Sequence, residues 1–221
     1  KRQYLYGDYD VLDSPFLDFG LQYFKKDKKI KDKITFINKW LNKLEIANEL
    51  KVSKIKLDNN KGQYLGYYYS LIINKQEVPL YDCGSGIHQI VLLLINIVDA
   101  SRYTLLLEEP ETNMHPKLQS TLADLFVEAK NKFGVKFIIE THSEYLIRKL
   151  QFLVADKETN ITNHNIAIYY LNQLKSISRN EEQIYKLDIR KDGFMNNDFG
   201  KGFFDEASTL SLNLLNLPNF N

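Results

Sequence analysis

The sequence has little cysteine, no charge imbalance and no long apolar run. Cys83 is the one cysteine among 221 residues, which excludes an internal disulfide framework and suits a reducing compartment. Lys and Arg number 29 against 28 Asp and Glu, so no overall charge draws the chain to nucleic acid or to an anionic membrane. The longest apolar run, Ile90 to Val98, is interrupted by Asn96 and is too short to span a bilayer. We therefore expect a cytoplasmic protein without membrane contact.

The chain begins at Lys1 instead of Met and shows no signal peptide, so we expect it to be part of a longer protein. Its composition, 44% hydrophobic and 26% charged, is that of a soluble globular protein. Its length is sufficient for one domain, or for one domain with a small appendage.

The first eighty residues predict helices and antiparallel strands. Residues 1–24 show no sustained period and predict a loop with one short helix. From Lys29 to about Leu50, apolar residues recur at helical spacing, namely Ile30, Ile34, Ile37, Leu41 and Leu44. Strand-like runs follow at Val52–Leu57 and Gln63–Ile73, with a turn predicted at residues 59–62.

Two features of this region allow more than one interpretation. The lysines between Lys25 and Lys33 alternate with Asp27 and Asp32, which favours a solvated helix face over a nucleic-acid patch. The tyrosines of the second strand, Tyr64 and Tyr67 to Tyr69, could stack on bases. Because aromatic residues are also good strand formers, packing within the sheet is the preferred interpretation.

Helices alternate with apolar strands between residues 81 and 156. Helices are predicted at residues 87–99, 116–133 and 144–153, and strands at Tyr103–Leu107 and Val135–Ile139. Pro116 and Gly134 supply the start and stop signals of the middle helix. Alternation with unbroken apolar strands predicts an α/β fold whose parallel sheet is covered by helices on both faces.

The remaining residues predict an antiparallel extension. Strands are expected near residues 166–171 and 183–189, with a turn at Asp192-Gly193 and a final helix within residues 202–217. The adjacent rings of Phe203 and Phe204 should pack on the core, because two exposed aromatics would form an unusual apolar patch. We expect three parts, residues 1–80, 81–156 and 157–221, with antiparallel additions at both ends of the parallel core.

Polar residues follow both predicted parallel strands. Glu108 and Glu109 end one strand, and residues 140–143, Glu-Thr-His-Ser, follow the other. Ligands bind beyond the carboxyl ends of parallel strands, so these carboxylates and His142 should face one crevice. There one carboxylate could hold Mg²⁺ while its neighbour orients an attacking water. Since successive residues of an extended chain point to opposite sides, the side chains of Glu108 and Glu109 should diverge.

Three segments together resemble the second half of an ABC-type ATPase, in the branch of the SMC-like and overcoming-lysogenization-defect ATPases. LLLEEPETNMHP resembles the Walker B strand, catalytic Glu and D-loop, THSEYLI the switch-histidine turn, and YDCGSGIHQI the signature motif. The later GKGFFDEA resembles a GFFD-type tail of a subfamily often encoded in bacterial phage-defence systems. The resemblance covers about residues 80–206 and implies a partial P-loop NTPase-type core.

The resemblance also implies roles for single residues. Glu108 would hold Mg²⁺, Glu109 would be the general base, and His142 would sense the γ-phosphate of ATP. The signature residues would contact the nucleotide bound by a second copy, so that a homodimer encloses two ATP molecules. The residues implied to bind nucleotide are Gly84, Ser85, Gly86 and, in the D-loop, Asn113.

A phosphate-binding Walker A loop is absent from the sequence. No GxxxxGK[ST] occurs, and without its backbone cradle and lysine the β- and γ-phosphates lack their main anchor. We therefore expect an N-terminal Walker A half to complete the site, and this chain alone to hydrolyse ATP poorly.

Two other functions remain open. One is a nucleotide-gated scaffold that recruits or restrains an effector protein without hydrolysis. The other, less favoured, is a metal-dependent nuclease, because nuclease carboxylates are usually spread over several elements whereas the candidates here crowd one turn: Glu108, Glu109, Glu111 and His115. Nothing in the sequence specifically supports nucleic-acid binding.

Overall fold

A computed structural model describes residues 15–25, 28–56, 64–172, 183–197, 199–200 and 203–215. The chain divides into two compact units, Lys1–Ser143 and Glu144–Asn221. The division into three parts stays a prediction, and the predicted turn at residues 59–62 lies outside the described residues.

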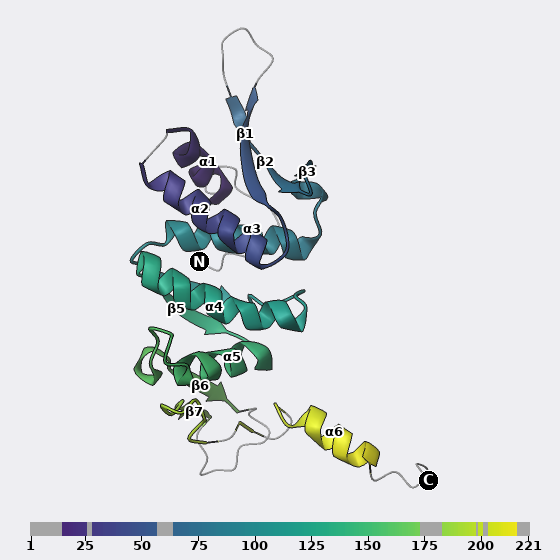
Figure 1. The fold of residues 1–221 in the computed structure, drawn as a ribbon, viewed down its shortest axis with the longest axis vertical. Coiled ribbons are helices and arrows are strands. Elements are labelled where there is room, and N and C mark those ends of the chain that lie inside the picture. The colour runs from purple at the N-terminus through teal and green to yellow at the C-terminus, as the bar shows by residue number, and fades with distance from the viewer. Residues whose placement is uncertain are drawn as a thin grey trace. The chain divides into compact units, whose positions relative to one another are not determined.

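In its described residues, the first unit contains an antiparallel sheet, a pair of parallel strands and four α-helices (Figure 1). In chain order they are α1 Pro15–Lys25, α2 Lys28–Lys43, β1 Glu49–Lys56, β2 Tyr64–Ile73, β3 Gln76–Pro79, the 3-10 turn Leu80–Asp82, α3 Ser85–Asp99, β4 Thr104–Glu108, α4 Pro116–Phe133 and β5 Lys136–Glu140.

Two sheets form in this unit. β1, β2 and β3 are antiparallel in that order, whereas β4 and β5 pair in parallel, with Leu106 opposite Ile138 and Glu108 opposite Glu140. The predicted α/β class, with parallel strands adjoining antiparallel additions, is confirmed. The short strand β3 was not predicted, because four residues are too few to show a period.

Helix α2 ends at Lys43, so its predicted extension to Leu50 is wrong. Glu45 has a φ of 59°, a left-handed conformation that stops a helix. Leu50 lies instead in β1, where its backbone N–H donates to Asn38 Oδ1 at 2.9 Å. Leu50 is buried in β1, and an apolar residue on the inner face of a helix would be buried too, so hydrophobicity alone could not distinguish the two arrangements.

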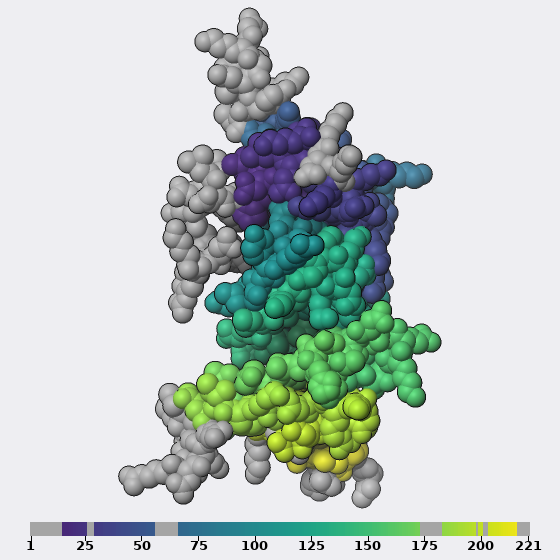
Figure 2. Space-filling model, turned by 90° about the vertical axis from the view of Figure 1, so that its left-hand side faces the viewer, coloured from purple at the N-terminus to yellow at the C-terminus, as the bar shows by residue number. Residues whose placement is uncertain are grey.

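Aromatic side chains fill the packing between helices and the antiparallel sheet. Tyr69 packs edge-on against Phe16 of α1, and Tyr67 stacks on Phe24. These contacts confirm that tyrosines of β2 pack within the fold. Figure 2 shows α1 and α2 side by side, in purple and indigo.

Lysines of α2 mostly form ion pairs or face solvent. Lys33 pairs with Asp99 of α3 at 2.6 Å, and Lys39 pairs with Glu128 of α4 at 2.7 Å. Together with the edge-on contact of Phe36 with Phe133, these pairs fix α2 against α3 and α4. In the predicted lysine-rich run, Lys25, Lys29 and Lys31 are exposed, whereas the Lys33 side chain is only 16% exposed in its pair with Asp99.

Among the described residues, helix packing covers one face of the parallel sheet, whereas two covered faces were predicted. On the covered face, Phe137 of β5 packs against Phe126 of α4. On the other face, Leu106 is 71% exposed and Ile138 is 62% exposed. Alternate residues of a strand point to opposite faces, so Glu108 and Glu140 lie on this exposed face too.

The second unit contains α5 Glu144–Ala155, a 3-10 turn Asn163–Asn165, β6 Ile168–Leu171, β7 Ile184–Leu187 and α6 Glu206–Leu215. β6 and β7 are antiparallel, as predicted. Gly193, with a φ of 84°, makes the predicted turn between the bridged residues Ile189 and Met195.

Phe203 and Phe204 pack as the sequence predicts. Phe203 lies edge-on to Tyr170, and both phenylalanines contact Phe199. The two rings are thus half-buried in an aromatic cluster of the second unit. None of the helices in the described part of the chain has the length and apolar content to cross a bilayer.

Candidate functional site

Parallel pairing of β4 with β5 places the two polar segments at the same edge of the sheet. Glu108 is in register with Glu140, and the backbone N–H of Glu109 donates to the carbonyl of Glu140 at 2.9 Å. This bond extends the pairing one residue past β4. The carboxyl ends of both strands therefore meet, as the sequence predicts for a ligand site.

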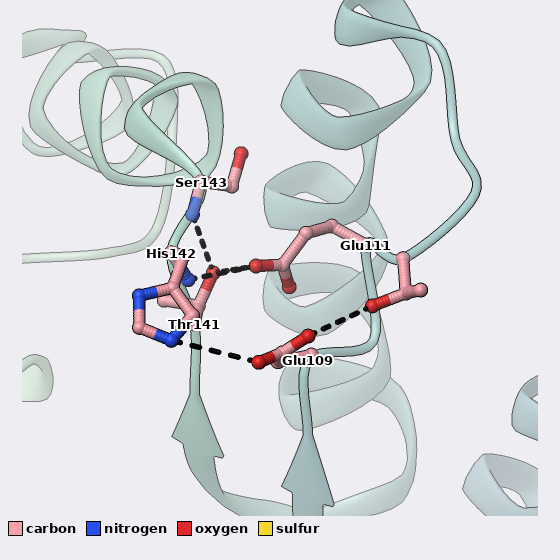
Figure 3. A network of polar contacts seen from close by, with 6 residues as sticks. Glu109, Glu111, Thr141, His142 and Ser143 are labelled. Atoms are coloured by element: carbon pink, nitrogen blue, oxygen red, sulfur yellow. Dashed lines mark hydrogen bonds and ion pairs between the residues drawn. The ribbon is translucent and has the colours of Figure 1, made fainter.

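Glu109 and His142 face each other across this edge (Figure 3). His142 Nε2 lies 3.5 Å from Glu109 Oε1, and the two side chains remain 67% and 50% exposed. The other carboxylate oxygen, Oε2, accepts a hydrogen bond from Thr112 Oγ1 at 3.2 Å. Glu109 is thus held on two sides while solvent still reaches it.

Glu109 does not continue the extended strand, so the predicted divergence of adjacent extended residues does not apply. Its φ is 42°, in the left-handed region that a non-glycine residue adopts at a cost in free energy. β4 ends at Glu108, and the chain turns at Glu109. The turn brings the Glu109 carboxylate to His142, and such strained residues are typical of functional sites.

Glu111 connects the loop after β4 to the turn after β5. The residue is 6% exposed, and its carboxylate oxygen Oε1 accepts from Thr141 Oγ1 at 2.6 Å and from the backbone N–H of His142 at 2.8 Å (Figure 3). Ser143 N–H in turn donates to Thr141 Oγ1 at 3.0 Å. The sequence showed Glu111 only as one acid among several, because no local pattern reports which carboxylate is buried.

Gln119 makes a second connection between the same segments. Ser143 Oγ donates to Gln119 Oε1 at 2.6 Å, and Gln119 Nε2 donates to the carbonyl of Met114 at 3.0 Å. Ser143 is buried. The first turns of α4 are therefore hydrogen-bonded to the loop before them and to the Thr141–Ser143 turn.

The residues available to a divalent cation are Glu108 and Glu140. Both lie at exposed strand ends in register, and neighbouring carboxylates that repel each other favour a bound cation. Their oxygen chemistry fits Mg²⁺. The sequence points to Glu108 as a metal ligand, and only strand pairing places Glu140 beside it.

The arrangement gives no support to the nuclease interpretation. Among the described residues, no group of three or more His, Cys, Asp or Glu could hold a metal ion. Glu111 is buried against Thr141, and His115 Nδ1 accepts from the backbone N–H of Lys117 at the start of α4. Both residues have local structural partners.

The predicted signature residues lie at the first turn of α3. Gly84 caps the helix, Ser85 begins it, and both are exposed. Gly86 lies so close to the loop after β4 that a Cβ there would come within 3.3 Å of the Asn113 carbonyl oxygen. Asn113 itself is exposed, with a φ of 64°. Two candidate nucleotide-binding segments are thus adjacent.

Residues 15–147, more than half of the chain, match the family described as the AAA ATPase domain. The chain belongs to this family. The ATPase part of the resemblance is therefore confirmed, and the match includes the signature segment, both parallel strands and the turn after β5. A search of curated proteins gives no match.

This AAA ATPase domain shares its fold with an SMC head. One similar structure is an SMC head bound to the C-winged helix domain of ScpA, with a TM-score of 0.51 and 12% identity, covering 72% of this chain and 43% of that chain. Another is a Pyrococcus furiosus Smc head with an extended coiled coil, bound to the C-terminal domain of ScpA. Its TM-score is 0.48 and its identity 11%, and the match covers 83% of this chain and 37% of that chain. The AAA ATPase domain thus spans less than half the length of these heads.

Proposed function

We propose that this AAA ATPase domain binds and hydrolyses ATP beyond the carboxyl ends of β4 and β5, once a Walker A lobe completes the site. The observation that supports this function best is the pairing of Glu109 with His142 at 3.5 Å. An acid and an imidazole at the shared end of parallel strands suit water activation beside a phosphate.

Glu109 is the general base in this proposal. A base must reach the water that it deprotonates, and the half-exposed carboxylate meets this need. Thr112 holds one carboxylate oxygen, so the group keeps its orientation. His142, on the opposite strand end, donates a hydrogen bond to the γ-phosphate and reports its loss after hydrolysis.

Glu108 would hold Mg²⁺, with Glu140 in register beside it. When bound, the ion offsets the negative charge of the phosphates.

The exposed face of the parallel sheet supports docking of a Walker A lobe. Leu106 and Ile138 are apolar, adjacent and mostly exposed, and Glu108 lies at the end of the same face. A lobe that covers these residues would place its phosphate loop beside the proposed metal ligand. The absence of GxxxxGK[ST] from this sequence makes a separate lobe necessary for tight phosphate binding.

The exposed start of α3 supports a homodimer that encloses two ATP molecules. Free N–H groups and the helix dipole suit a phosphate at Gly84 and Ser85. By resemblance, these residues and Asn113 address the nucleotide of the second copy. ATP then links the two copies, and hydrolysis releases them.

A role in bacterial anti-phage defence, with an effector protein as partner, is the biological setting that we propose. It rests on the likeness of the segment around Phe203 and Phe204 to a GFFD-type tail. The SMC head of similar fold is bound to a domain of another protein, ScpA, which is a precedent for a protein partner.

Glu109→Gln in the complete protein tests the function, because it removes the charge of the base and keeps its shape. Turnover of ATP should fall by about two to four orders of magnitude, while ATP binding stays near the parent value and the ATP-bound dimer accumulates. Glu108→Gln is the matched control, since it should weaken the dependence on Mg²⁺ itself. Hydrolysis by Glu109→Gln at the parent rate would exclude this base and favour a nucleotide-gated scaffold.

A further inference from the structure

Glu111 is a charged residue buried beside the proposed site without lying in it. The buried polar or charged side chains in the described part of the chain are Ser70, Glu111 and Ser143. Burying a carboxylate costs free energy unless hydrogen bonds compensate. The bonds that Glu111 makes therefore indicate why the fold keeps it.

Among the described residues, the donors that bond to the Glu111 carboxylate all lie in one turn, and all of them bond to the same oxygen. Oε1 accepts from the Thr141 hydroxyl and from the backbone N–H of His142. Oε2 is buried and has no hydrogen-bond partner among the described residues. Glu111 is thus joined to the residue whose imidazole faces Glu109, and not to Glu109 itself.

We propose that Glu111 is a positioning residue that fixes the Thr141–His142 turn and so keeps the His142 imidazole at Glu109. This inference rests on the proposed hydrolysis of ATP. Two hydrogen bonds, from the hydroxyl of Thr141 and from the backbone N–H of His142, converge on Oε1 of Glu111 and tie these adjacent residues to the loop after β4. Because Glu111 lies two residues after Glu109, one short loop sets the position of both partners of the 3.5 Å pair.

The proposal predicts an effect on turnover and little effect on nucleotide binding. His142 would contact the γ-phosphate, whereas the main anchors of ATP would lie in the Walker A lobe and at α3. Loss of the carboxylate in Glu111→Met should lower kcat about 10- to 100-fold, the loss typical when a hydrogen-bond partner that orients a metal ligand is removed. The KM for ATP should stay at the parent value.

Glu111→Gln separates hydrogen bonding from charge. Its amide oxygen can accept both bonds at the position of Oε1, and its amide nitrogen takes the place of Oε2, which has no partner to lose. Turnover should lie between those of Glu111→Met and the parent, closer to the parent. A Glu111→Gln as slow as Glu111→Met would overturn the proposal, because the charge itself would then be essential, as for a metal ligand.

A double-mutant cycle with His142→Ala distinguishes positioning from general stabilisation. If Glu111 acts through His142, Glu111→Met should slow the parent strongly and the His142→Ala protein little. A structural role would lower turnover by the same factor in both backgrounds, and that result would overturn the proposal. The complete protein, with its Walker A lobe, is used for these rates.

Hydrogen exchange in the 221-residue chain tests the hydrogen bonds without ATP. Glu111→Met should speed amide exchange in the segment Thr141–Ser143 and leave the buried part of α4, Leu122–Ala129, unchanged. Unchanged exchange at Thr141–Ser143 would overturn the proposal even if turnover falls. A complete protein that hydrolyses no ATP would overturn the proposed function, whereas faster exchange would still show that Glu111 holds the turn.

Discussion

Leu106 of β4 and Ile138 of β5 are paired in register on parallel strands, and both side chains face away from the helix that packs on the sheet. Adjacent exposed apolar residues in the middle of two paired parallel strands are unusual, because a parallel sheet normally has both faces covered. This pair is the surface on which we propose that the Walker A lobe docks.

Replacing both residues, Leu106→Gln with Ile138→Gln, should change the free energy of unfolding of this chain by only about 0.5 kcal/mol or less, since both are exposed. In the complete protein the same change should lower the free energy of unfolding by about 1.5–3 kcal/mol per residue, because the lobe would bury both apolar side chains and glutamine loses that burial energy. Urea unfolding followed by the fluorescence of the single, buried Trp40 measures both values. Leu171→Gln, an exposed strand residue of the second unit, is the control. Equal small effects in both proteins would exclude docking on this face.

Ser85→Arg should prevent ATP-dependent dimerisation of the complete protein and leave each copy folded. Ser85 is exposed in the first turn of α3, so a large side chain fits in the monomer but blocks a phosphate from the helix start. Light scattering with and without ATP measures the dimer. Ser208→Arg, also exposed in a first helical turn, should dimerise normally. Dimerisation of both variants would contradict a role of α3 in binding across copies.

Tyr69→Phe should reduce the free energy of unfolding by about 0.5–1.5 kcal/mol. The buried hydroxyl donates to the carbonyl of Phe16 and links β2 to α1, so its removal leaves a carbonyl with one bond fewer. Tyr81→Phe, at a side chain that is 74% exposed, should change nothing measurable. Chemical unfolding of the two variants in parallel provides the comparison, and equal stabilities would show that this bond is not formed in solution.

Stability should fall as the pH drops below about 6.5, the ordinary pKa of histidine, partly because of His88. Burial lowers the pKa of His88 in the folded chain, because desolvation disfavours the charged imidazolium. The unfolded chain then binds more protons below pH 6.5, which favours unfolding, whereas the full stability is present above that pH. His88→Leu should reduce the pH dependence of the unfolding temperature between pH 5 and 7.5. The exposed His164→Leu serves as control, and an unaltered dependence in His88→Leu would exclude this cause.

Local sequence signals determined many of the helices and strands and the strand ends at which the candidate site lies. Pro116 begins α4 and Gly134 ends it in the left-handed conformation, as the sequence predicts, because caps depend on residues within one helical turn. Unbroken apolar runs that end in polar residues predicted the parallel strands and a shared edge for Glu109 and His142. The structure has both the parallel pairing and the close approach of these two side chains. These features follow from neighbours in the chain.

Tertiary structure alone decided which acid is buried, which strand residues are paired and which sheet face is exposed. Glu111 and Glu109 are two residues apart and chemically identical, yet one is buried under Thr141 and the other faces His142. Leu50 belongs to a strand, not a helix, because Asn38 and the antiparallel partner β2 bind its backbone. Burial and strand register depend on contacts between segments far apart in the chain, and no local period or propensity contains that information.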